Sequence, residues 1–263
     1  MRAHQRSSAA VNRLLDTLPS SDRRRLLGAC DTVELAFADV LYAPKARFDH
    51  VYFPTDSFIS LIMPIDESAS LEVGLVGNEG MFGAPLVLGV EESPMRAVVQ
   101  GSGPALRMGA APFRRELARS PALRRQIGRY ISVHVSQLAQ AAACARFHVV
   151  KARLARWLLM TQDRAHADTF RVTQEFLSLM LGVRRVGVTK AAGSLQKRSL
   201  IHYARGDVTV LDRRGLKAAS CGCYQADHES YERMFREPRS TGRSEKSSGA
   251  ARAESVRRST FSG

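Results

Sequence analysis

The chain of 263 residues is poor in cysteine, with only Cys30, Cys144, Cys221 and Cys223. Four irregularly spaced cysteines do not provide the disulfide framework of a small secreted domain, so we expect a reducing compartment. Long apolar runs are also missing, because even residues 154–160 are interrupted by Arg156. No apolar segment that would indicate a signal peptide follows the basic N-terminus. These absences predict a cytoplasmic protein without a membrane partner.

The sequence also lacks the familiar catalytic signatures. It contains no GxSxG, HExxH or GxGxxG motif and no Gly-Lys-Ser or Gly-Lys-Thr. The glycines between residues 74 and 83 lack the lysine that a phosphate-binding loop needs. We therefore expect no enzymatic activity and no catalytic residue.

Basic charge, by contrast, is abundant and unevenly distributed. The chain has 39 Lys and Arg against 25 Asp and Glu residues, a net charge of +14. Residues 1–145 hold 16 basic and 14 acidic side chains, whereas residues 146–263 hold 23 and 11. Residues 33–111 are acidic, with a net charge of −6. This asymmetry predicts a polyanion-binding domain joined to a domain with another task.

The hydrophobic pattern divides the chain into five segments. Two short helices are predicted within residues 1–32, where leucines recur at helical spacing on both sides of Pro19. Residues 33–111 contain short β-rich runs such as VELAF, HVYFP and RAVVQG, separated by turn residues, which indicates a β-sandwich or barrel. Residues 236–263 are rich in Ser, Gly and Arg and predict a disordered basic tail.

Residues 112–147 predict a long helix with an apolar seam. Six residues on it recur at alternating spacings of four and three, which is the pattern of a coiled coil. A helix that packs on its own barrel would show similar spacing, but a long helix between two domains favours pairing with a second copy. The predicted dimer interface consists of Ile127, Ile131, His134, Leu138, Ala141 and Ala145.

Residues 148–235 predict a winged helix-turn-helix. Thr173 is suited to cap one helix, Gly182 to end it, and Val188, Ala191 and Leu195 to give the next helix a buried face. The segment LIHYARGDVTVLD then predicts two strands, 200–203 and 208–211, that form the wing. The exposed face of the second helix suits a DNA major groove. The predicted DNA-binding residues are Thr173, Gln174, Arg184, Arg185, Val186, Thr189, Lys190, Lys197 and Arg205.

The order of these segments resembles the Crp/Fnr family of bacterial transcription regulators over roughly residues 12–235. The most specific similarities are TQEFLSLMLGVRRVGVTKAAGSLQKRSLI, RLARWLL, VYFP, GNEGMFG and the ending CGCY. The resemblance implies an α+β protein with a jelly-roll β-barrel like a cyclic-nucleotide-binding domain, a long dimerisation helix and a winged helix-turn-helix. It further implies a homodimer, double-stranded DNA with a palindromic operator, and RNA polymerase as a partner.

The resemblance also assigns roles to single residues. Arg185 takes the place of the principal guanine-binding arginine, and Lys190 that of the second basic residue that contacts bases. Val186 stands where many members have a glutamate, so a different half-site is expected. Glu79, Gly80, Ser93 and Met95 fall in the effector pocket, but Ser93 and Pro94 replace the Arg-Ser pair that holds a cyclic phosphate. We therefore expect no cofactor and weak or no binding of cyclic AMP, and the pocket holds either another ligand or none.

The cysteines do not form a recognisable metal motif. Cys221 and Cys223 are separated by one residue instead of the two usual at zinc sites, and Cys144 and His148 are explained by a buried helix end. Cys221 and Cys223, near His228, could form a metal or thiol switch, but a structural or incidental role is favoured, and no metal site is predicted. The alternative to a DNA-binding regulator is a small-molecule-sensing module that acts through protein–protein contacts, with the basic half exposed to solvent.

Overall fold

The computed structural model describes residues 11–66 and 70–236. The predicted tail lies outside these residues from position 237 onward. The described chain begins with α1 (Arg13–Asp16) and α2 (Ser20–Leu27), the two predicted short helices. Asn12 caps α1 by accepting a hydrogen bond from the Leu15 amide, and its Nδ2 donates to the carbonyls of Pro54 and Gly80, both at 2.9 Å. This buried side chain fastens the first helix to the β-domain.

In the part of residues 31–109 that the structure describes, seven strands form two antiparallel sheets. The first sheet has the order β1-β7-β3, with β1 (Asp31–Leu35), β3 (His50–Pro54) and β7 (Gly103–Gly109). The second has the order β2-β6-β4-β5, with β2 (Val40–Tyr42), β4 (Phe58–Pro64), β5 (Ser70–Val76) and β6 (Arg96–Gly101). The predicted fold class is confirmed, although the strands described here form two separate sheets instead of a hydrogen-bonded closed barrel.

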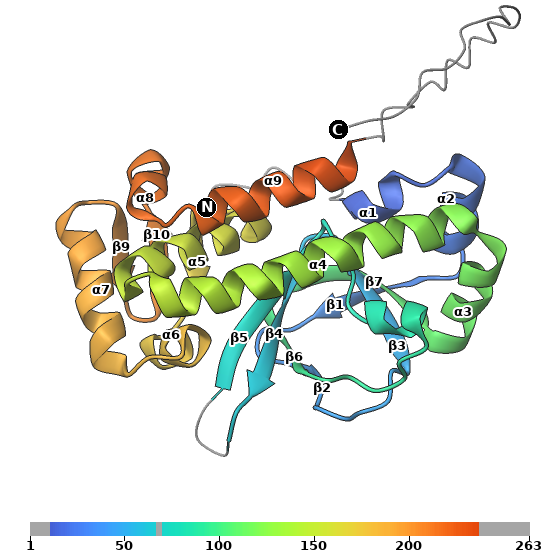
Figure 1. Ribbon diagram of the computed structural model, residues 1–263, viewed down its shortest axis with the longest axis horizontal. Helices are drawn as coiled ribbons and strands as arrows, with labels where there is room; N and C mark the ends of the chain where they lie inside the picture. The colour runs from blue at the N-terminus through green and yellow to red at the C-terminus, as the bar shows by residue number, and fades with distance from the viewer. Residues whose placement is uncertain (1–10, 67–69, 237–263) are drawn as a thin grey trace, which may run out of the picture.

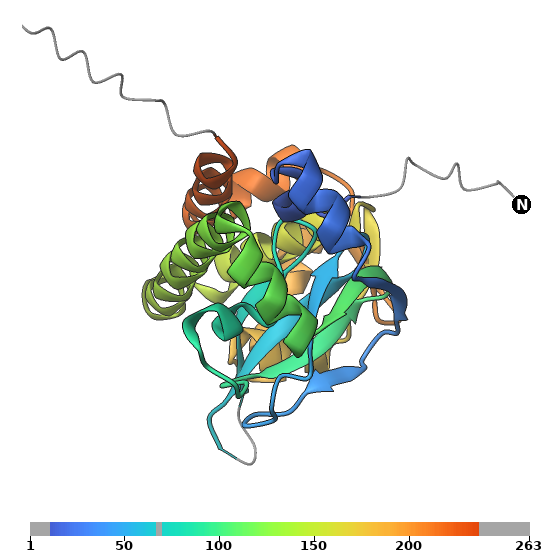
Figure 2. The ribbon, with the colours of Figure 1, turned by 90° about the vertical axis from the view of Figure 1, so that its right-hand side faces the viewer.

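Aromatic side chains fill the core of this β-domain. Phe53, Phe113 and Tyr130 are fully buried there, and they come from β3, α3 (Ala110–Arg119) and α4 (Pro121–Phe147). A 3₁₀ turn, η1 (Ala84–Leu88), lies between β5 and β6. Viewed along α4, as in Figure 2, the helices α1 to α4 cover the sheets on one side. The long helix is therefore part of the β-domain's own core.

The helix α4 runs along the molecule and connects its two ends (Figure 1). Ser120 caps it, because its Oγ accepts from the Leu123 amide at 3.0 Å. The last helix, α9 (Cys223–Phe235), lies beside α4, and Tyr231 and Met234 enter the core of the β-domain. The Tyr231 hydroxyl donates to Gln137 Oε1 at 3.1 Å. The end of the described chain thus returns to the first domain.

The remaining elements form a second domain at the other end of α4. They are α5 (Val150–Ala165), β8 (Thr169–Arg171), α6 (Gln174–Leu181), α7 (Arg185–Lys197), β9 (Ile201–Ala204), β10 (Asp207–Val210) and α8 (Arg213–Ala219). The three strands pair in the order β8-β10-β9. Ile62 and Val98 of the β-domain belong to this second core, so the two domains are packed together. Among the described helices, none is long and apolar enough to span a membrane.

Candidate nucleic-acid interface

The helices α6 and α7 are joined by a sharp turn at Gly182. This residue has φ of 60° and ψ of 43°, the left-handed conformation that glycine adopts at least cost. Thr173 caps α6, since its Oγ1 accepts from the Phe176 amide at 3.1 Å. Val188 and Leu195 are fully buried and hold α7 against the domain core. The predicted helix-turn-helix is therefore present with the expected cap, turn and buried face.

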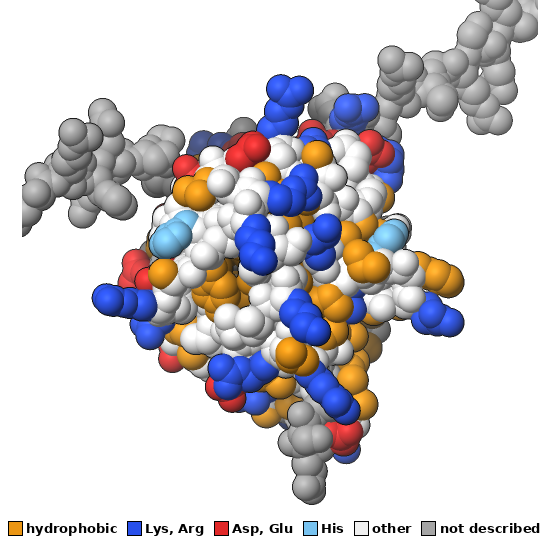
Figure 3. Space-filling view, turned by 90° about the vertical axis from the view of Figure 1, so that its left-hand side faces the viewer, with side chains coloured by type: hydrophobic (Ala, Val, Ile, Leu, Met, Phe, Trp, Pro, Cys, Tyr) orange, Lys and Arg blue, Asp and Glu red, His pale blue; other side chains and the backbone are white. Residues whose placement is uncertain are grey.

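The outer face of α7 carries the predicted base-contacting side chains. All six predicted residues of this segment are exposed: Arg184, Arg185, Val186, Thr189, Lys190 and Lys197. Figure 3 shows the end of the molecule that contains α7, where Lys and Arg side chains spread over the face and Asp and Glu lie mainly toward its rim. A face of this charge attracts the phosphates of a duplex.

The N-terminus of α7 points to solvent without a side-chain cap. Arg184 occupies the cap position, and its side chain makes no capping hydrogen bond. The first amide groups of α7 are therefore available to an anion such as a DNA phosphate. These uncapped amide groups offer a phosphate group hydrogen-bond donors at the exposed end of the helix.

The two helices of the motif also fix one another's polar side chains. The Thr189 hydroxyl lies 2.9 Å from Gln174 Oε1 and 3.0 Å from the Arg185 carbonyl, and it donates toward these oxygens. Gln174 is half-buried at the start of α6. Its amide nitrogen remains a donor for a phosphate or a base. This contact orients both predicted DNA-binding side chains before any DNA arrives.

The wing is a hairpin with a two-residue turn. Arg205 and Gly206 connect β9 to β10, and both have positive φ, at 54° and 85°, as a tight hairpin turn requires. The sequence predicted a turn between strands 200–203 and 208–211, and the structure confirms it, with the paired strands extending to Ala204 and Asp207. The tip of the wing faces the start of the motif, and a depression of about 340 Å³ is lined by Thr173, Gln174, Arg185, Tyr203, Arg205 and Gly206.

Behind the helix-turn-helix lies a polar contact with the β-domain. Glu72 of β5 accepts from Trp157 Nε1 at 2.7 Å and from Ser60 Oγ at 2.5 Å. Burial raises the pKa of Glu72 to about 7, although both hydrogen bonds act in the opposite direction. Arg153 of α5 donates to the Leu181 carbonyl at the end of α6. The DNA-facing motif is therefore positioned by groups that sequence patterns did not single out.

The four predicted effector residues are in different surroundings. Glu79 is buried and accepts from Arg164 of α5, with Nη2–Oε1 and Nε–Oε1 distances of 2.6 and 2.9 Å. A Cβ atom on Gly80 would lie 2.4 Å from the ring of Tyr130, so glycine permits this close packing. The Ser93 hydroxyl donates to the Met95 carbonyl at 2.7 Å. A ligand at Glu79 would have to compete with Arg164, so the effector pocket stays a prediction.

The residues predicted to form a dimer seam do not all face the same surroundings. Ile127 is fully buried in the core of its own chain, and His134 packs beside Tyr130 with ring centroids 5.8 Å apart. Ile131, Leu138, Ala141 and Ala145 are half-buried. Ile127 has no surface for a partner, which corrects its assignment. The physical reason is that α4 uses one side of its apolar stripe to cover the sheets.

Comparisons with known proteins agree with this arrangement. Residues 152–219 match the family model of the Crp-like helix-turn-helix domain. None of the curated proteins matches the chain.

Solved structures show the same fold across both domains. FixK2 from Bradyrhizobium japonicum superposes with a TM-score of 0.62 at 11% identity, covering 73% of this chain and 98% of that one. The c-di-GMP responsive global regulator CLP from Xanthomonas campestris gives 0.60 at 17% identity, with coverages of 73% and 99%. A transcriptional regulator of the CRP/FNR family from Thermus thermophilus gives 0.60 at 22%, with 72% and 98%.

Proposed function

We propose that this chain binds specific DNA sequences and regulates transcription in the bacterial cytoplasm. It contains a Crp-like helix-turn-helix domain and has the fold of Crp/Fnr regulators. The exposed N-terminal turns of α7 carry the proposal. Arg185, Val186 and Lys190 are all exposed there, within the segment that matches the domain model. Arginine at this place binds guanine O6 and N7, and valine contacts only a thymine methyl group.

The proposed regulator acts as a homodimer through α4. The line Gly128, Ile131, Val135, Leu138, Ala142 and Ala145 has alternating spacings of three and four and carries no charge. Gly128, Val135 and Ala142 are exposed, and the other three are half-buried, so the line has surface to offer a second copy. Val135, the largest of the three exposed residues, is 59% exposed. Small residues at its ends permit the two helices to approach closely.

A symmetric dimer places two copies of α7 in successive major grooves. In this motif the half-site centres lie about 10–10.5 bp apart, so the operator is expected to be an imperfect palindrome. RNA polymerase is the further partner that the family resemblance suggests. An input to the β-domain would alter DNA affinity by binding one arrangement of the two domains better than another.

The surroundings of Glu79 and Arg164 suggest where an effector ligand would bind. Both residues line a cavity of about 230 Å³ whose other walls include Asp163 of α5 and Asp227 and Tyr231 of α9. A ligand that paired with either charge would alter the link between the β-domain and α5. Cyclic AMP is not the proposed ligand, because Arg164, which lines this space, is already paired with Glu79 at 2.6 Å.

Selection of random duplex DNA on the purified protein tests the proposal. Sequencing after several rounds is expected to give a palindromic motif, and Arg185→Ala is expected to lose or relax it. Lys217→Ala, on α8 and away from the proposed base-contacting face, is the matched control and should keep the motif. Equal retention of specific and random duplexes by the unchanged protein would contradict sequence-specific binding.

A further inference from the structure

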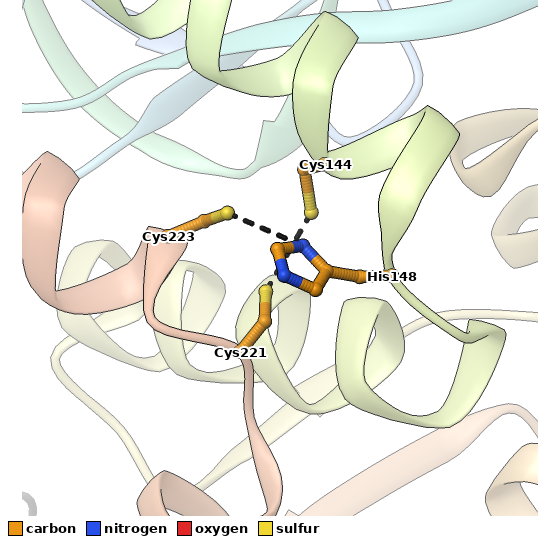
Figure 4. A group of neighbouring side chains, drawn as sticks. All are labelled: Cys144, His148, Cys221 and Cys223. Atoms are coloured by element: carbon orange, nitrogen blue, oxygen red, sulfur yellow. Dashed lines mark hydrogen bonds between the residues drawn. The ribbon is translucent and has the colours of Figure 1, made fainter.

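Three of the four cysteines and one histidine converge at the junction of the two domains. The ligand atoms of Cys144, His148, Cys221 and Cys223 all lie within 4.8 Å of one another. Figure 4 shows the three sulfur atoms and the imidazole ring turned toward a common centre. The three cysteine side chains are buried and form a small cluster separate from both domain cores. They are drawn together from two sequence segments.

Local structure explains how each segment presents two ligands. Cys144 and His148 are four residues apart, at the last turn and the C-cap of α4, so they lie on one face of the helix. Cys221 and Cys223 flank Gly222, where the chain turns into α9. Packing of α9 along α4 then brings the two pairs into contact. The spacing Cys-x-Cys is uncommon for zinc, but the turn aims both thiols inward.

Two of the distances between ligand atoms already match a single tetrahedral ion, and all four ligand atoms lie within 4.8 Å of one another. The Cys144 and Cys221 sulfurs are 3.6 Å apart, and Cys223 Sγ lies 3.5 Å from His148 Nδ1. Zinc–sulfur bonds of about 2.3 Å and zinc–nitrogen bonds of about 2.0–2.1 Å place tetrahedral ligand atoms roughly 3.5–3.8 Å apart. A disulfide requires sulfurs about 2.05 Å apart, and all four cysteines are free. An iron–sulfur cluster, with several atoms between its ligands, needs a wider cage.

The surroundings suit a site with three thiolates. Arg153 and Arg156 lie close enough to interact electrostatically with Cys144, and Arg153 also interacts with Cys221. Gln140 Nε2 donates to Cys223 Sγ at 2.9 Å, which is the kind of outer contact that orients a metal-bound sulfur. Three thiolates and Zn²⁺ carry a net charge of −1, and the neighbouring guanidinium groups offset it. Soft sulfur with imidazole favours zinc over magnesium or calcium.

We propose that Cys144, His148, Cys221 and Cys223 bind one Zn²⁺ ion that fixes the DNA-binding domain on the long helix. The helix α4 ends at Phe147 and α5 begins at Val150, so two residues form the covalent hinge between the domains. Cys144 comes from α4 on one side of this hinge, His148 lies in the hinge itself, and Cys221 and Cys223 come from the segment before α9 on the other side. The bound ion forms a second connection between the two domains, beside the covalent hinge, and sets the angle of α7 relative to α4.

Zinc content and cobalt spectroscopy test the site without DNA. The full chain, purified under reducing conditions, is expected to contain one zinc per chain by elemental analysis. After zinc is removed by chelation, added Co²⁺ is expected to give the visible bands of tetrahedral coordination and the ultraviolet charge-transfer absorption of thiolates. Zinc should displace the cobalt and raise the unfolding temperature. These readouts come from the unchanged protein, so they do not depend on whether variants fold.

Variants then identify the ligands. Cys144→Ser, Cys221→Ser and His148→Ala should each weaken zinc binding more than about 100-fold, because even outer contacts change affinity by 10–100-fold. Cys30→Ser removes the cysteine that lies outside the cluster and should bind zinc as the unchanged protein does. Intact thiols without bound zinc, a Cys144–Cys221 disulfide under reducing conditions, or several irons with sulfide would each overturn the zinc site.

The effect on DNA is a separate measurement that rests on the proposed function. Zinc-free protein is expected to bind the selected operator at least tenfold more weakly, with affinity restored by stoichiometric zinc. Zinc binding without any change in operator affinity would overturn the hinge role and leave the site intact. Failure of all DNA binding, with zinc bound normally, would instead contradict the proposed function.

Discussion

Arg164 of α5 and Glu79 of the β-domain form an ion pair that is almost entirely shielded from water. Their side chains are 6% and 8% exposed, and Nη2 lies 2.6 Å from Oε1. Burial by itself would lower the pKa of Arg164, but Glu79 and Tyr231 outweigh this effect and raise it. Arg164 also donates to the Met160 carbonyl at 2.9 Å. The pair joins the loop after β5 to the first helix of the DNA-binding domain.

Replacing Arg164 with methionine should destabilise the protein by about 3–5 kcal/mol, because Glu79 then remains buried without its partner. Urea unfolding followed by the fluorescence of Trp157, the single tryptophan, measures this loss. The double variant Arg164→Met with Glu79→Gln should recover part of it.

Arg47→Met is the matched control, since its pair with Glu91 is 72% and 49% exposed and should contribute under about 1 kcal/mol. Equal losses for Arg164→Met and Arg47→Met would show that burial does not strengthen the dependence of Glu79 on its partner.

Glu72 should make the folded state less stable as the pH rises. Its pKa is raised from 4.5 to about 7 in the folded protein, so the folded state holds its proton longer than the unfolded chain. The contribution of protonated Glu72 to the stability of the folded state is fully present below about pH 4.5 and is lost as the pH rises through about 7. Glu72→Gln keeps the hydrogen-bonding shape without the charge.

This variant should exceed the unchanged protein in stability by about 2–3 kcal/mol at pH 8 and by little near pH 5. Urea midpoints from circular dichroism across this range measure the difference. Glu34→Gln removes an exposed carboxylate on β1 as a control. A constant advantage of Glu72→Gln at every pH would contradict a titrating Glu72.

Arg185 and Lys197 should affect operator binding differently. They lie at opposite ends of α7, separated by about 18 Å at 1.5 Å per residue. Arg185→Ala should cost about 1–3 kcal/mol on the selected operator and relax its sequence preference. Lys197→Ala should weaken binding to all duplexes alike. It should also reduce the salt dependence of the binding affinity by the amount expected for about one phosphate contact.

Fluorescence anisotropy at several salt concentrations, on the operator and on a scrambled duplex, separates the two effects. The same loss on both duplexes for Arg185→Ala would remove this residue from the base-contacting set.

Val135→Arg should convert the proposed dimer into monomers. Val135 lies in the middle of the uncharged line on α4, where a symmetric interface brings like charges together. Light scattering after gel filtration measures the mass. Ser136→Arg adds the same charge at the neighbouring exposed position, outside the line, and should leave the mass unchanged. Monomers from the unchanged protein at micromolar concentration would contradict the dimer.

Local patterns in the sequence predicted most of the elements correctly. The β-rich runs, the cap at Thr173, the turn at Gly182 and the buried side of α7 depend on neighbouring residues, and the structure confirms them. Periodicity does not show which neighbour a face will cover. Ile127 therefore fitted a dimer seam equally well, although the structure buries it against the sheets.

Charge patterns were similarly incomplete. The sequence alone does not show which groups Arg153 and Arg156, on the helix that follows α4, contact. In the structure Arg153 donates to the Leu181 carbonyl, and Arg156 pairs with Asp227 of α9 at 2.5 Å. A basic residue on a helix has the same local signal whether its partner is water or a carboxylate from a remote segment.

The sequence by itself determined the helix-turn-helix, its basic outer face and the division into an acidic β-domain and a basic domain, because these features depend on residues close together in the chain. The tertiary structure alone decided that Arg164 meets Glu79 and that Cys144 and His148 meet Cys221 and Cys223. These contacts join segments more than 70 residues apart, and only the packing of α5 and α9 against the rest of the fold brings their side chains together.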